Sequence, residues 1–185
     1  GKAAPVDIVK VNDRYFINIS SMGLDAEVAY FANKLKETKF VPGFLSYYLG
    51  LICTLVKCRS YHLKLIIDGK EVEEDALLVA VANGRYYGKG ILPAPQAHFD
   101  DGLLDICLIE KKGRLEIIRL FPKYVKGKHA DIPGVRFFTC KNVKITASAP
   151  IAINLDGEVS MINEATYEII PHGISVVYPI PPELS

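Results

Sequence analysis

Alternation of apolar and polar positions runs through most of this chain and predicts short β-strands. Near the start, VDIVKV and RYFINIS alternate on either side of Asn12-Asp13, which predicts a hairpin. YHLKLIID and KEVEEDALLVAVAN do the same around Asp68-Gly69, and LLDICLIE predicts one more strand. Residues 135–179 predict five short strands, separated by Lys141-Asn142, Ala149-Pro150, Asp156-Gly157 and Pro171-His172-Gly173. The pattern predicts a mainly β (α+β) fold, an antiparallel β-sandwich or barrel-like domain with a few helices.

Three segments place apolar residues at helical spacing. The first, AEVAYFANKLKE, follows a predicted loop from Ser20 to Asp25, in which Ser21 or Asp25 would be the N-cap. The second, Phe40 to Cys58, has the strongest apolar stripe, which is more often core than a surface for lipid or another domain. The third, RLEIIRLFPKYVKG, is predicted to be helical only until Pro122, because proline lacks an amide hydrogen.

The stretch from Val79 to Asp105 combines polar side chains with residues that break regular structure. After the apolar run LLVAVAN it contains four glycines and two prolines before the next predicted strand. Long connections of this kind are typical of functional loops or of disorder. Two tyrosines and the apolar pair Ile91-Leu92 favour order, so the stretch is either a packed surface loop or a functional one.

Composition limits the class of protein. The 185 residues correspond to one domain spanning 1–185, half of them are hydrophobic, and a net charge of +1 argues against a nucleic-acid partner. Lys123, Lys126, Lys128 and His129 form a basic cluster, which is more typical of a solvated face than of a phosphate site.

The four cysteines provide no zinc motif, because none stands in a CxxC pair. The N-terminus has no signal-peptide pattern, so a reducing cytoplasm is the expected location. No uninterrupted apolar stretch is long enough to cross a bilayer.

Two acidic turns carry the candidate chemistry. DDGLLD begins at Asp100 and NLDGE ends at Glu158, and each adjoins an apolar strand, so the carboxylates should project from strand ends. A carboxylate beside a substrate hydroxyl can act as a general base, and carboxylate and carbonyl oxygens are ligands that Mg²⁺ prefers. Asp-Gly is also a common turn dipeptide, so the spacing alone leaves the catalytic and structural interpretations open.

Four blocks carry a resemblance to a known family: FINISSMGLDAEV, VANGRYYGKGILPAPQAHFDDGLLDI, KGKH and INLDGE. In order and spacing they resemble the C-terminal half of the bacterial soluble lipid kinases of the diacylglycerol kinase / sphingosine kinase family, over residues 14–178. The resemblance implies a β-rich domain like the second domain of the NAD kinases. The family's GGDGT motif and its GTGNDFA-like segment do not occur in this sequence, so we expect the N-terminal ATP-binding domain to be absent from this chain.

The resemblance also implies roles for particular residues. The proton acceptor is expected in the DGE turn, with Asp156 and Glu158 as the candidates. Mg²⁺ is expected at the carbonyl of His98, the side chain of Asp101 and the carbonyl of Leu103. A cleft facing the nucleotide-binding domain is expected to be lined by Asn83, Gly84, Tyr86, Tyr87 and Gly88.

The implied activity is transfer of phosphate from ATP to a lipid hydroxyl such as that of diacylglycerol, with ATP bound mainly by the absent domain. The implied partners are a lipid alcohol at the inner membrane face, where a cytoplasmic enzyme would associate peripherally, and the protein's own N-terminal domain. An exposed apolar cleft face would favour a homo-oligomer, and this chain alone should be inactive. The alternatives are a non-catalytic lipid-binding or regulatory module, an NAD kinase-like domain, and a kinase for a non-lipid alcohol.

Overall fold

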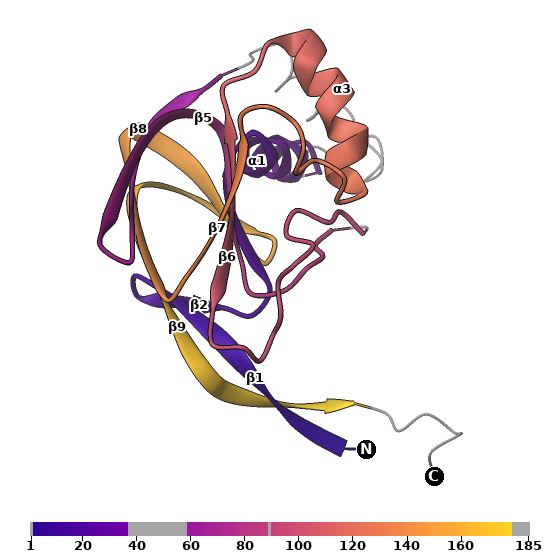
Figure 1. Cartoon of the computed structure of the whole chain (residues 1–185), viewed down its shortest axis with the longest axis vertical. Helices are drawn as coiled ribbons and strands as arrows, with labels where there is room; N and C mark the ends of the chain where they lie inside the picture. Colours follow the sequence, from indigo (N-terminus) through magenta and orange to yellow (C-terminus); the bar gives the residue numbers. More distant parts are fainter. Residues whose placement is uncertain (1, 37–58, 89, 179–185) are drawn as a thin grey trace.

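The computed structural model describes residues 2–36, 59–88 and 90–178 of the chain. These residues form one antiparallel sheet of nine strands and two helices (Figure 1). In chain order the elements are β1 (Lys2–Val11), β2 (Arg14–Phe16), β3 (Ile19–Gly23), α1 (Leu24–Lys36), β4 (Tyr61–Ile67), β5 (Lys70–Ala82), β6 (Leu104–Glu110), α3 (Arg114–Val125), β7 (Val135–Cys140), β8 (Asn142–Leu155) and β9 (Glu158–Tyr178).

The sheet runs in the order β2-β1-β9-β8-β3-β5-β6-β7, and β4 pairs with both β5 and β8. Because β3 also pairs with both of these strands, β3 and β4 occupy one row of the sheet, one after the other. In Figure 1 the sheet curls around its interior, while β1 and β9 leave the body together as an arm that ends at the two termini. The predicted mainly β, sandwich- or barrel-like fold is confirmed.

Both faces of the central strands are covered, which explains why LLVAVA does not alternate. On β5, Val79 and Val81 point into the main core inside the curled sheet, whereas Leu78 and Ala80 join a second core beneath α3 and the loop that follows β5. Strands buried on both faces have nearly continuous apolar runs. The loop that follows β5 therefore begins at a fully buried part of the sheet.

The two predicted hairpins are present. β1 pairs with β2 across the turn at Asn12, and β4 pairs with β5 across Asp68-Gly69. Asp68 has φ 44° and Gly69 has φ 82°, as a two-residue hairpin turn with positive φ at both positions requires.

Several predicted boundaries were wrong. The segment after Asn18 is strand β3 rather than a loop, because its backbone pairs with β5 and β8 on its two edges. The predicted strand RYFINIS is therefore broken at Ile17-Asn18. The five strands predicted after Val135 are three, because Ala149-Pro150 lies at a register shift within β8 and Pro171-His172-Gly173 lies inside β9. Such irregularities bend a long strand without ending it.

Helix α1 begins without the predicted cap. It starts at Leu24, so Ser21 belongs to β3 and Asp25 lies in the first helical turn. The chain turns from strand to helix at Gly23, which has φ 88°. A Cβ there would lie 2.4 Å from the carbonyl oxygen of Leu77, so this corner needs glycine.

Helix α3 runs through Pro122 to Val125, against the prediction that it would end there. Pro122 removes one hydrogen bond near the end of the helix, and both Pro122 and Ile118 are exposed, so water can hydrate the freed carbonyl.

The predicted helix from Phe40 to Cys58, with Cys53 and Cys58, lies outside the described residues. Cys107 and Cys140 are free and buried, and both lie in apolar strands where cysteine packs as a small apolar residue. No helix in residues 2–36, 59–88 or 90–178 is long and apolar enough to span a membrane.

Candidate active site

Both acidic bends lie at the same edge of the sheet. β8 ends, β3 begins, β5 ends and β6 begins along this edge, as the register shows (Ser20 opposite Leu155, Ile19 opposite Ala82, and Ala82 opposite Asp105). The DGE turn follows β8 and the DDGLLD loop precedes β6, so only β3 and β5 separate them. Three strand spacings amount to roughly 14 Å, which one substrate molecule can span.

The DGE turn is held by hydrogen bonds from the connection between β2 and β3. The Asp156 carboxylate accepts the backbone N–H of Ile17 at 2.8 Å, of Asn18 at 3.2 Å and of Ile19 at 2.9 Å. Both carboxylate oxygens of Asp156 are thus already occupied by backbone donors, and the side chain closes the turn onto its neighbour.

Glu158 has different surroundings, although it is only two residues away. Its side chain is 79% exposed and pairs with Arg14 of β2, whose side chain is 42% exposed. Exposed ion pairs of this kind contribute little to stability and exchange readily with water. Of the two predicted proton acceptors, Glu158 is the one whose oxygens face solvent at the sheet edge.

Asn18 links the DGE turn to the loop that follows β5. Its carbonyl accepts the N–H of Asn83 at 2.9 Å and of Gly84 at 3.0 Å, and its side chain donates to the carbonyl of Tyr86 at 2.7 Å. Nothing in the sequence distinguishes Asn18, because it stands in an ordinary alternating run. Its role appears only when Asp156 and the loop are brought to either side of it.

The predicted cleft residues separate into two groups. Asn83 is fully buried and donates to the carbonyls of Asp7 and Ile17, so it organises the loop from below. Gly84 is also buried, whereas Tyr86 is 54% exposed and Gly88 is exposed. Only the second group, together with Tyr87 described below, has surface that a ligand can touch.

The predicted metal loop is anchored by Asp7 of β1. The Asp7 carboxylate is fully buried and accepts the N–H of Gly102 and of His172, each at 2.7 Å, while its own N–H donates to the carbonyl of Phe99. Asp7 was not among the predicted site residues, since it lies about ninety positions before the loop in a strand pattern. It fixes the bend that carries Asp101.

Asp101, the predicted metal ligand, lies exposed at the bend that precedes β6. Its Oδ1 accepts the N–H of Leu103 at 3.0 Å, and the side chain is exposed beside a polar groove of about 460 Å³. Burial, and then the charge of Asp101, raise the pKa of Asp105, so the two carboxyl groups lie within electrostatic reach. The described residues contain no cluster of three or more His, Cys, Asp or Glu side chains for a metal, so Mg²⁺ here would need backbone carbonyls, such as the predicted ones of His98 and Leu103.

His98 itself is positioned by its neighbour. Arg85 donates to the carbonyl of Ala97 at 2.8 Å and lies 3.1 Å from the His98 ring. The guanidinium therefore ties the start of the loop to the end that carries the predicted metal ligands.

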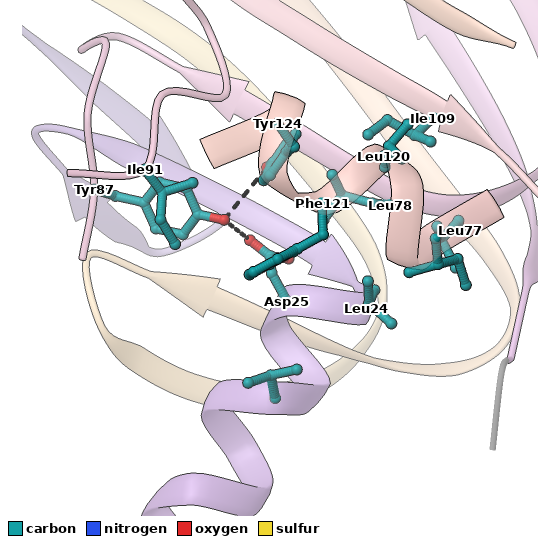
Figure 2. A pocket seen from close by; sticks show the side chains of 12 residues that line it. Leu24, Asp25, Leu77, Leu78, Tyr87, Ile91, Ile109, Leu120, Phe121 and Tyr124 are labelled. Carbon is teal, nitrogen blue, oxygen red and sulfur yellow. Dashed lines mark hydrogen bonds between the residues drawn. The ribbon is translucent and has the colours of Figure 1, made fainter. Parts of the chain in front are cut away.

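A second feature is an apolar cavity of about 30 Å³ between α1 and α3, with a carboxyl group at one side (Figure 2). The Tyr87 hydroxyl donates to Asp25 at 2.6 Å and lies 3.3 Å from the Tyr124 hydroxyl. Burial raises the pKa of Asp25 to about 6, and burial and the charge of Asp25 raise that of Tyr87. The other walls are apolar, and include Leu24, Leu77, Ile91, Leu120 and Phe121.

The predicted basic cluster is corrected by the structure. His129 is fully buried, with Nε2 3.2 Å from the carbonyl of Pro93 and 3.5 Å from the Cys107 sulfur, and burial lowers its pKa. It anchors the loop to the end of α3 and does not belong to a solvated face. Lys123, Lys126 and Lys128 are exposed, as predicted.

The curled antiparallel sheet, with an anchored acidic loop and a carboxylate turn at one edge, places the chain among the mainly β, sandwich-like domains. Residues 18–178 match the family described as the YegS C-terminal NAD kinase beta sandwich-like domain, and the chain belongs to this family.

Curated relatives are named as kinases. The chain is 28% identical over 185 residues to a diacylglycerol kinase of Mycobacterium tuberculosis, covering 97% of this chain and 59% of that protein. It is 30% identical over 179 residues to a diacylglycerol kinase of Bacillus subtilis, covering 97% and 58%. A crystal structure of a protein proposed to be a diacylglycerol kinase of Bacillus anthracis has a TM-score of 0.72 at 27% identity, covering 100% of this chain and 60% of that one. The chain thus spans about 60% of the length of these relatives.

Proposed function

We propose that this chain is the lipid-substrate domain of an ATP-dependent lipid kinase that phosphorylates a hydroxyl such as that of diacylglycerol. The observation that carries the proposal is the shared sheet edge, where Asn18 joins the DGE turn to the start of the loop that leads to the acidic bend. The kinase names of the relatives and their additional length support an ATP-binding domain in a longer protein.

In this proposal Glu158 is the proton acceptor and Asp156 is a positioning residue. Glu158 is exposed and takes the proton from the lipid hydroxyl while the hydroxyl oxygen forms a bond to the γ-phosphorus of ATP and the bond to ADP breaks. Asp156 holds the turn by accepting three backbone N–H groups. Mg²⁺ at the Asp101 loop would supply a fixed positive charge that orders the loop.

The apolar cavity supports a lipid substrate. Tyr87 belongs both to the loop after β5 and to the cavity wall, so this loop joins the cavity to the predicted cleft residues. Its volume of about 30 Å³ has space for little more than a water molecule, so it serves here as an apolar surface next to Tyr87 and not as an acyl-chain pocket.

The test is phosphorylation of diacylglycerol from ATP by a protein that contains this chain together with a nucleotide-binding domain. Glu158→Gln should lower kcat by about 10²–10⁴-fold with unchanged unfolding, as expected on loss of a general base. Glu164→Gln is the matched control, because Glu164 is another exposed, ion-paired carboxylate of β9 and should keep the wild-type rate. Wild-type rates for both Glu158→Gln and Asp156→Asn would disprove a base in this turn.

This chain alone should not transfer phosphate, because its sequence contains no GGDGT phosphate-binding motif. The measurement is the same assay with the 185-residue chain. Sustained ATP-dependent phosphorylation of diacylglycerol would contradict the proposal that a separate domain binds ATP.

A further inference from the structure

The outward face of α3 combines exposed apolar side chains with a concentration of positive charge. Leu115 is 70% exposed and Ile118 is 56% exposed, and with the exposed Pro122 they follow at spacings of three and four residues, so they share one face. The opposite face buries Ile117, Leu120 and Tyr124. Large apolar side chains exposed side by side on a helix usually mark a contact surface.

Charge is unevenly distributed around this helix. Residues 111–128 contain seven of the 22 Lys and Arg residues of the chain but only one of its 21 Asp and Glu residues. The rest of the chain has 15 basic and 20 acidic residues. Arg119, Lys123, Lys126 and Lys128 are exposed, and within the described part of the chain they form no ion pair. A protein that is nearly neutral overall thus carries a strongly basic segment on one face.

We infer that the outward face of α3 docks on an anionic lipid bilayer, with Leu115 and Ile118 in the headgroup layer and the cations beside them on lipid phosphates. Apolar residues on one stripe with lysine and arginine along its flank are the features of helices that lie in a membrane interface. The negative potential of an anionic leaflet is complementary to the charge of residues 111–128.

The location of the face agrees with this occupant. In Figure 1, α3 lies at the end of the molecule opposite the arm of β1 and β9. The inner side of α3 supplies Leu120, Phe121 and Tyr124 to the apolar cavity that Tyr87 also lines. A bilayer on the outer face would therefore lie one helix away from the cavity. The purpose of this docking rests on the proposed function: α3 would be the surface through which a lipid kinase reaches the membrane that holds its substrate.

The first experiment uses the absence of tryptophan from the chain. Ile118→Trp gives a single reporter on the face, and its emission should shift to the blue when phosphatidylcholine vesicles with about 30% phosphatidylglycerol are added. Met161→Trp is the matched control, because Met161 is 52% exposed on β9, and its emission should not shift. Equal shifts of both reporters, or none at position 118, would overturn the inference.

The second experiment measures vesicle binding by flotation, without ATP or turnover. Arg119→Gln with Lys123→Gln should weaken binding by about 30-fold, since each cation near an anionic surface contributes about fivefold. Leu115→Ser and Ile118→Ser should each weaken it by about tenfold or more, whereas Lys70→Gln, an exposed lysine elsewhere, should bind like wild type. Because these side chains are exposed, the variants keep the core.

Two results would contradict the bilayer as occupant. One is undiminished binding by the Arg119/Lys123 variant. The other is that the wild-type protein does not bind vesicles, while sedimentation shows that it self-associates and that Leu115→Ser does not. This result would assign the face to a second copy of the chain. Neither depends on kinase activity, so failure of the proposed catalysis leaves this test intact.

Discussion

At Gly84 the backbone passes between two side chains that come from distant parts of the chain. A Cβ at this position would lie 2.2 Å from Asn18 Oδ1 and 2.3 Å from the ring of Phe99. Asn18 holds the DGE turn and Phe99 precedes the acidic loop, so Gly84 permits the two bends to approach each other. The glycine is required here by space, because its neighbours occupy the volume that a side chain would need.

Gly84→Ala should therefore lower the free energy of unfolding by about 1–3 kcal/mol, the usual cost of overpacking. Urea denaturation measures it. Gly113→Ala is a control with more room, since its Cβ would lie 3.2 Å from the end of the Glu116 side chain. A Gly84→Ala protein as stable as wild type would show that Asn18 and Phe99 do not pack on this backbone.

Asp25 should make stability depend on pH. Burial raises its pKa in the folded state to about 6 from an ordinary 3.8, so the folded protein binds this proton more tightly than the unfolded chain. Stability therefore falls as the pH rises from about 4 to about 6, by about 1–3 kcal/mol, and stays at the lower level above that range.

The measurement is urea unfolding of wild type and Asp25→Asn across this pH range. The decrease in the free energy of unfolding that Asp25 causes should be absent from the variant. Asp105, whose pKa is also raised, contributes to the pH dependence of both proteins equally. Identical pH dependence of the two proteins would place the Asp25 carboxyl in contact with water rather than in the cavity wall.

At the scale of elements, the connection between β2 and β3 depends on a carboxylate from the other half of the chain. Asp156 lies 137 residues from Ile19, and it satisfies three successive backbone N–H groups where the strand pattern breaks. The break at Ile17-Asn18 allows β2 to pair with β1 while β3 pairs with β5 and β8. The Asp156 side chain thus holds the point where the chain passes from the β1–β2 hairpin to β3.

Asp156→Asn should destabilise the fold by about 1–3 kcal/mol, because an amide group replaces acceptors that face backbone donors. Glu158→Gln should change stability by less than about 1 kcal/mol, since its ion pair with Arg14 is exposed. Chemical unfolding of the two single variants gives the comparison. Equal stabilities would contradict the assignment of Asp156 as a positioning residue.

At the scale of the whole molecule, curling of the sheet assembles the site from segments far apart in the sequence. Asp7 in the first strand bonds to Gly102 in the loop and to His172 in the last strand. The main core contains residues from β1 and β2 as well as from β4, β5, β6, β8 and β9. The first and last strands of the sheet therefore hold the loop in place.

Mg²⁺ should stabilise the whole domain if it binds at the Asp101 loop. At concentrations about 100-fold above the dissociation constant, the gain is about 2.7 kcal/mol, seen as a higher Tm in Mg²⁺ than in EDTA. Asp101→Asn should abolish the increase, whereas Asp100→Asn, a neighbouring exposed carboxylate, should retain it. An equal increase in Asp101→Asn would place the metal elsewhere.

The sequence by itself determined the mainly β fold, both hairpins and the position of the two acidic bends at strand ends. These features follow from alternation and from turn residues, which act between near neighbours in the chain. It also supplied Asp156, Glu158 and Asp101, though without separating their roles. Because Asp-Gly serves structural and catalytic turns alike, residue type alone could not do so.

The tertiary structure alone decided that the two bends share one edge, that Asn18 and Asp7 support them, and that Tyr87 meets Asp25. It also decided that Ala149-Pro150 and Pro171 bend long strands without ending them. The physical reason is distance along the chain: the Asp7–His172 bond joins residues 165 positions apart, and no local pattern records such a contact. Pairing on both edges of β3 likewise overrode its loop-like composition.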